Sequence, residues 1–110
     1  MDVSALFIEI VGVYSKHGWQ LRRVLLRPET QFDPNINGGQ VPVVEAEIDA
    51  LWFSRPSHAG REAWELRVLS ENPFALFETF EADENEEQRN EMLLEMENRL
   101  REYFTTKRSN

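Results

Sequence analysis

Two runs of consecutive large apolar residues, at positions 24–26 and 51–53, most constrain how this chain can fold. Both runs lie in segments with the composition of β-strands. Successive side chains of a strand point to opposite faces of the sheet, so each run places apolar groups on both faces. A sheet with one wet face would instead show an alternating pattern. The sequence therefore predicts that both sheet faces are buried along these two strands.

Apolar spacing along the rest of the chain predicts two helices and further strands. A helical stripe runs over residues 4–16, and a second begins near Asp83, which with Glu86 makes a start similar to a capping box. Residues 73–82 fit either a strand or a helix, and their phenylalanine and threonine content favours a strand. The other expected strands cover residues 19–27, 43–54 and 62–69.

The order of these elements predicts one α+β domain spanning residues 1–110. A chain of 110 residues is long enough for a single core and too short for two domains. Links of hairpin length favour an antiparallel sheet of three or four strands. Two amphipathic helices most simply share one sheet face, so we expect a two-layer sandwich with the N-terminal and C-terminal helices on the same face. We expect residues 1–3 and 105–110 to be frayed.

This arrangement leaves the second face of the sheet uncovered where the two apolar runs lie. Large apolar side chains on an exposed face are typical of protein interfaces. We therefore expect Leu25, Leu51, Trp52 and Phe53 to contact a second copy of the chain or another protein. The alternative is a bulge near residues 50–51 that returns these side chains to a single core.

Composition argues against several classes of function. The chain has 12 Lys+Arg against 20 Asp+Glu, a formal net charge of -8, which disfavours a general nucleic-acid binder. It has no cysteine, which excludes disulfides, thiolate metal sites and a cysteine nucleophile. Its apolar stretches are too short to cross a membrane. No segment resembles a secretory signal, so we expect a cytoplasmic location.

The 54–61 loop carries the best candidate for a ligand site in the sequence. Arg55, His58 and Arg61 stand close together in it. Guanidinium groups and an imidazole bind anions, and a histidine also transfers protons near neutral pH. The alternative is an ordinary connecting loop, because spacing alone does not make the three side chains converge.

Residues 33–38 match the first half of a calcium-binding loop without its second half. Val44 stands where such a loop needs a bidentate glutamate, and the segment offers a single carboxylate. Phosphate loops, dinucleotide-binding fingerprints, zinc-protease motifs and nucleophile elbows are missing from the sequence. We therefore expect no metal and no cofactor, and we favour a protein that is not an enzyme.

These patterns favour a non-catalytic interaction module. We expect a homodimer that binds a protein client or acts as an adaptor, with the acidic last helix facing outward. In size, acidity and order of elements the chain resembles the secretion-chaperone-like class, and the resemblance implies a role of that kind. The alternative is a small-ligand domain or minor enzyme with its site at the 54–61 loop.

Overall fold

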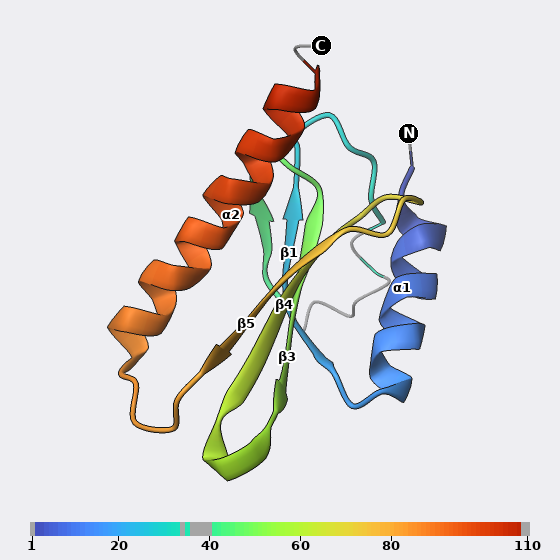
Figure 1. Cartoon of the computed structure of the whole chain (residues 1–110). Coiled ribbons are helices and arrows are strands. Elements are labelled where there is room, and N and C mark those ends of the chain that lie inside the picture. The colour runs from blue at the N-terminus through green and yellow to red at the C-terminus, as the bar shows by residue number, and fades with distance from the viewer. Residues whose placement is uncertain (1, 34, 36–40, 109–110) are drawn as a thin grey trace.

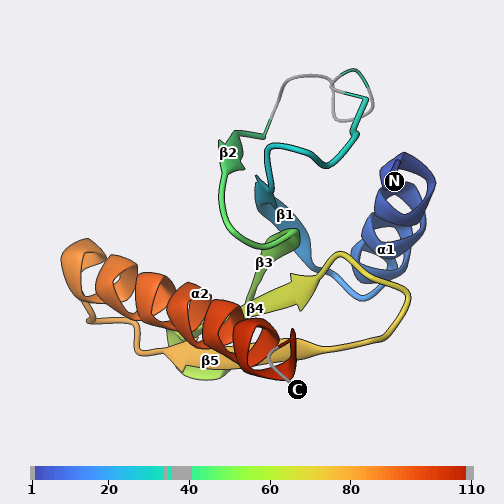
Figure 2. The same ribbon diagram turned by 90° about the horizontal axis from the view of Figure 1, so that it is seen from above.

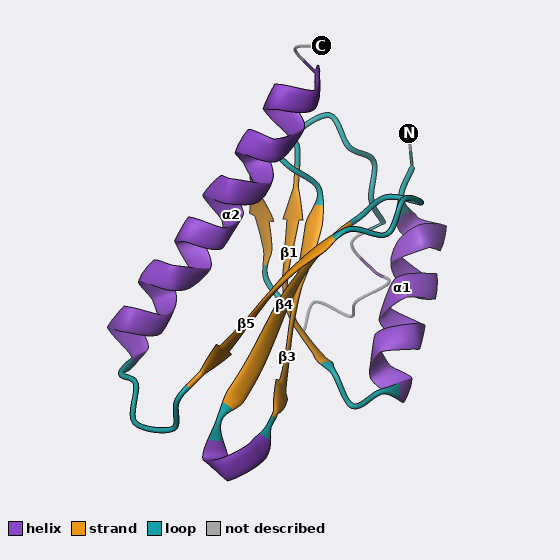
Figure 3. Ribbon diagram, viewed as in Figure 1, coloured by secondary structure: helices purple, strands orange, loops and turns teal. Residues whose placement is uncertain are grey.

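The computed structural model describes residues 2–33, 35 and 41–108. Within them the chain forms two helices, five strands and one short 3₁₀ turn at His58–Gly60 (Figure 1, Figure 3). The helices and strands are, in chain order, α1 (Ser4–Lys16), β1 (Gln20–Leu26), β2 (Val43–Glu45), β3 (Ala50–Pro56), β4 (Glu62–Val68), β5 (Ala75–Phe80) and α2 (Glu86–Arg108). None of these described helices has the length and apolar character needed to cross a bilayer.

The five strands form one mixed sheet in the order β2-β1-β3-β4-β5. β2 runs parallel to β1, and the other neighbours are antiparallel. A register shift between Leu21 and Arg23 marks a bulge in β1. Residues 73–82, which fit either a strand or a helix, therefore contain the strand β5, as their composition favours. β5 is one edge of the sheet.

The two helices lie on opposite faces of the sheet, as the view from above shows (Figure 2). One buried cluster joins α2 to one face, and a second joins α1 to the other. The α2 cluster is built on Leu25, Trp52, Trp64, Leu66, Leu93, Met96 and Leu100. The α1 cluster is built on Phe7, Ile10, Val24, Leu26, Leu51 and Phe53. We call the two sides the α2 face and the α1 face.

The α+β class is confirmed, and three details differ from the prediction. The sheet has five strands rather than three or four, and it contains a parallel pair. The helices do not share a face, so the molecule has three layers instead of two. The physical reason lies in the two apolar runs: a sheet that is apolar on both faces buries both when each face takes one helix.

The predicted strand 43–54 is wrong, because a turn divides it into β2 and β3. β2 and β3 flank β1 on opposite sides, so the chain crosses the end of β1 between them. Asp49 fixes this crossing: its Oδ1 accepts a hydrogen bond from the backbone N of Arg27 at 2.8 Å. The alternation of acids with apolar residues in this segment reflects a turn that buries Ile48, which is 7% exposed.

The sequence signal for the end of α1 is confirmed, and the signal for the start of α2 is wrong. Gly18 follows α1 with φ 84°, in the left-handed region that favours glycine, as its position after the helix predicts. The capping box at Asp83 does not form. Asn85 caps α2 instead, because its Oδ1 accepts a hydrogen bond from Gln88 N at 2.8 Å.

Candidate functional site

The four residues predicted to form an interface lie inside the chain. Leu25 and Trp52 are each 1% exposed and belong to the α2 cluster. Leu51 and Phe53 are 0% exposed and belong to the α1 cluster. Neither of the two predicted explanations holds at positions 50–53, because the chain's own helices cover both faces there. These side chains are core and offer no surface to a partner.

Arg55, His58 and Arg61 do not converge on a common point. Arg55 lies over the ring of Trp19, 5.6 Å from its centroid, and its Nη1 donates to the backbone oxygen of His17 at 2.6 Å. Arg61 turns toward the end of β5, where its Nε donates to Glu81 Oε2 at 3.1 Å. His58 is exposed in the 3₁₀ turn. The loop therefore does not assemble the predicted anion site.

The outer edge of β5 is an open edge of the sheet that carries an exposed aromatic side chain. β5 ends the strand order, so no described strand pairs with its outer side (Figure 1). Val68 N donates to Phe74 O at 2.9 Å, so Phe74 and Val68 form a hydrogen-bonded pair of the β4–β5 ladder. The backbone groups of every second residue from Phe74 onward therefore point toward β4. By antiparallel alternation, Ala75, Phe77 and Thr79 direct their backbone groups outward. Phe77 is 59% exposed, the highest exposed fraction among the large apolar residues described.

Phe77 extends an aromatic group on the α1 face. Its ring meets the Trp19 ring edge to face, with centroids 6.4 Å apart. Trp19 in turn meets Tyr14 at 6.1 Å, and Tyr14 stacks on the buried Phe53 at 4.1 Å. The row thus runs from the core to the open edge, and Phe77 is its exposed end. We call Tyr14, Trp19 and Phe77 the aromatic row.

The aromatic row includes one group whose protonation is linked to folding. The Tyr14 hydroxyl donates a hydrogen bond to Glu65 Oε2. Burial raises the pKa of Tyr14 above its ordinary value of 10.0, and the hydrogen bond to Glu65 and its charge raise it further. A phenol whose pKa is raised by folding stabilises the folded state below its unfolded pKa and loses that contribution as pH rises.

We therefore expect the wild type to lose stability above about pH 10 more steeply than the Tyr14→Phe variant, which has no phenol at this position. Urea unfolding at pH 9 and at pH 11 measures both proteins. At pH 9 the variant should be less stable by about 1 kcal/mol, the usual contribution of one hydrogen bond. Parallel pH profiles of the two proteins would show that Tyr14 ionises as easily folded as unfolded.

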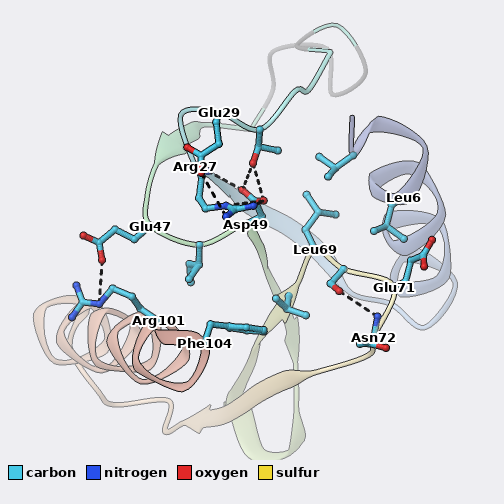
Figure 4. A pocket seen from close by; sticks show the side chains of 15 residues that line it. Leu6, Arg27, Glu29, Glu47, Asp49, Leu69, Glu71, Asn72, Arg101 and Phe104 are labelled. Carbon is cyan, nitrogen blue, oxygen red and sulfur yellow. Dashed lines mark hydrogen bonds and ion pairs between the residues drawn. The ribbon is translucent and has the colours of Figure 1, made fainter. Parts of the chain in front are cut away.

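A cleft of about 420 Å³ opens at the end of the sheet, between the start of α1 and the end of α2 (Figure 4). Its floor is apolar, since Ile48, Val68 and Leu69 are 5–7% exposed. Leu6 of α1 and Phe104 of α2 form two of its walls. This volume is in the range of small-molecule sites in proteins, which are about 300–1,000 Å³.

Charged groups surround this apolar floor, and the two arginines are paired. Arg27 Nη2 lies 3.3 Å from Asp49 Oδ2, and Arg101 Nε lies 3.5 Å from Glu47 Oε2. Asp49 also accepts the hydroxyl of Thr30 at 2.8–2.9 Å, so both of its oxygens are engaged. Such a carboxylate holds the rim together and is poorly suited to act as a general base.

Comparison with protein-family models, with curated proteins and with solved structures finds no match for this chain. Within the described ranges, no group of three or more histidine, aspartate or glutamate side chains is placed to hold a metal ion. Most of the predicted turn at 33–38 lies outside the described residues. The open β5 edge and the end cleft are therefore the two candidate sites that the geometry provides.

Proposed function

We propose that this protein is a non-catalytic interaction domain that forms a homodimer by pairing β5 with β5 of a second copy. The observation that carries the proposal is the open β5 edge with Phe77 exposed at its centre. Proteins usually protect such edges with lysine, proline, a bulge or a covering element. β5 contains no lysine or proline, and Glu78 is its one charged residue. The pairing of β5 with β4 shows no register shift, so β5 has no bulge either. The proposed dimer interface is thus a sheet edge, whereas the sequence predicts an interface on a sheet face.

The register of such a pair follows from the alternation along β5. Since Ala75, Phe77 and Thr79 present their backbone groups outward, an antiparallel pair centred on Phe77 places Ala75 opposite Thr79 of the second copy. The two Phe77 rings then lie side by side on the α1 face, each next to its own Trp19. Leu76 comes opposite Glu78, so no like charges meet directly across the pair.

The charges near this edge are mixed in sign. Two copies of net charge -8 repel each other, so a dimer forms best where acidic groups stay apart. Tyr103 of α2 stacks on Phe74 at 4.5 Å, which marks the flank of the helix next to β5. Arg99 stands one helical turn from Tyr103 on that flank, and Glu95 stands one turn further along it, where the two can pair. Glu87 and Glu91 instead line an outer groove of α2.

Size-exclusion chromatography with light scattering tests this proposal. We expect the wild type at about 100 µM to have twice the mass of one chain. Phe77→Lys should raise the dissociation constant at least about 100-fold, because a central aromatic anchor is lost and a charge is added to the edge. A monomeric wild type at that concentration would overturn the proposal.

Val43→Lys is the matched control, because Val43 is 47% exposed on the opposite edge strand β2. The substitution makes the same change of charge and leaves β5 intact, so the variant should remain dimeric. Circular dichroism checks that both variants are folded. If Val43→Lys dissociates while Phe77→Lys does not, the chain pairs through β2 and the proposed edge is wrong.

A further inference from the structure

The end cleft combines an apolar floor with an excess of negative charge at its rim. Four carboxylates and two guanidinium groups line it, which gives the lining a net charge of -2. The carboxylates are those of Glu29, Glu47, Asp49 and Glu71. Neither the β5 edge nor the proposed dimer uses this cavity, which lies at the end of the sheet (Figure 4).

Pairing inside the cleft decides which charge a ligand should carry. Arg27 is engaged by Asp49 and also lies 3.5 Å from Glu29, and Arg101 is engaged by Glu47. An anionic ligand would have to displace these carboxylates to reach a guanidinium group. A cation avoids such competition at Glu71, the one lining carboxylate that pairs with neither arginine among the described residues.

We infer that the end cleft binds a small amphipathic amine, with its ammonium group at the acidic rim and its apolar body on the floor. The ammonium group would lie near Glu71, which is exposed at the rim beside the wall formed by Leu6 (Figure 4). The body would contact Ile48 and Leu69, which together with Phe104 form apolar surface on more than one side. The cleft is wide enough for a ring with a short chain.

Two probes of the same skeleton test the inference, 2-phenylethylamine and 3-phenylpropionate. Titration of ¹⁵N-labelled protein followed by NMR should show amide shifts at 27–30, 47–49 and 68–72 with the amine. For a probe of this size we expect a dissociation constant of about 1–10 mM. The carboxylate should bind at least about ten-fold more weakly. Equal or tighter binding of the carboxylate, or no shifts with the amine, would overturn the inference.

Glu71→Gln removes one rim charge without touching the core, since Glu71 is exposed. It should weaken binding of the amine about three- to ten-fold. Glu91→Gln makes the same change on the outer groove of α2 and should leave the affinity unchanged. Equal losses in both variants would mean that the amine responds to net charge alone and not to the cleft. Since Phe77→Lys does not alter the cleft, the dimer and the ligand site can fail independently.

Discussion

Replacing Trp52 by alanine, and separately replacing Phe53 by alanine, is expected to lower the free energy of unfolding by about 3–5 kcal/mol in each case. The two residues are neighbours in the chain and face opposite sides of the sheet. Trp52 packs in the α2 cluster, where its Nε1 also donates to Glu97 Oε2 at 2.7 Å. Phe53 packs in the α1 cluster under Tyr14. Each substitution therefore opens a cavity in a different core.

Urea unfolding followed by far-UV circular dichroism measures both losses without depending on the fluorescence of Trp52. Leu94→Ala is the control, because Leu94 is 58% exposed on α2 and its removal should cost less than about 0.5 kcal/mol. A two-layer molecule with one buried face would show a large loss at one of the two positions only. If Phe53→Ala costs no more than Leu94→Ala, α1 does not form a second core.

The sequence predicts the elements of this fold better than their arrangement. The helix at 4–16 and the strands near 19–27 and 62–69 form as their apolar spacing indicates. The doubled apolar runs also correctly indicate that both faces are buried. The prediction that both helices share one face is wrong, because periodicity shows which side of a helix is apolar and not which face of the sheet that helix covers. The predicted dimer places a second copy on a face that α1 itself covers.

The division of 43–54 into two strands has a different cause. Period-2 alternation continues through the turn, so the pattern contains no break at Asp49. The break depends on a contact with Arg27 and Thr30, which precede Asp49 by about twenty positions. A tertiary contact of this kind leaves no local signal, so β2 and the crossing of β1 could not be read from the segment itself.

The sequence contains no local signal for either candidate site, for related reasons. Phe77 lies in the segment 73–82, which fits either a strand or a helix, and its exposure depends on β5 being the last strand of the sheet. The end cleft joins residues from the beginning, middle and end of the chain, such as Leu6, Asp49 and Phe104. The charged residues of the 54–61 loop are close in sequence, yet Arg55 donates to His17 after α1 and Arg61 donates to Glu81 after β5.

The Asp49→Asn substitution is expected to lower the free energy of unfolding by about 3 kcal/mol, a large loss for a single exchange of nearly equal shape. The Asp49 side chain is 11% exposed and lies 3.3 Å from Arg27 Nη2. Its two oxygens also accept the Arg27 backbone N–H and the Thr30 hydroxyl. An asparagine offers one acceptor oxygen and turns an NH₂ group toward the guanidinium, so several partly buried donors lose their acceptor.

Glu29→Gln separates this effect from a simple change of charge. Glu29 lies 3.5 Å from the same Arg27, but its side chain is 67% exposed, and exposed pairs contribute little. The control should therefore cost less than about 0.5 kcal/mol in urea unfolding. Hydrogen exchange of the Arg27 amide adds a local readout, because this N–H should exchange faster in Asp49→Asn and unchanged in Glu29→Gln. Equal small losses in both variants would mean that the crossing between β2 and β3 does not depend on the Asp49 side chain. Backbone hydrogen bonds, such as that from Leu69 N to Asp49 O at 2.9 Å, would then hold the crossing instead.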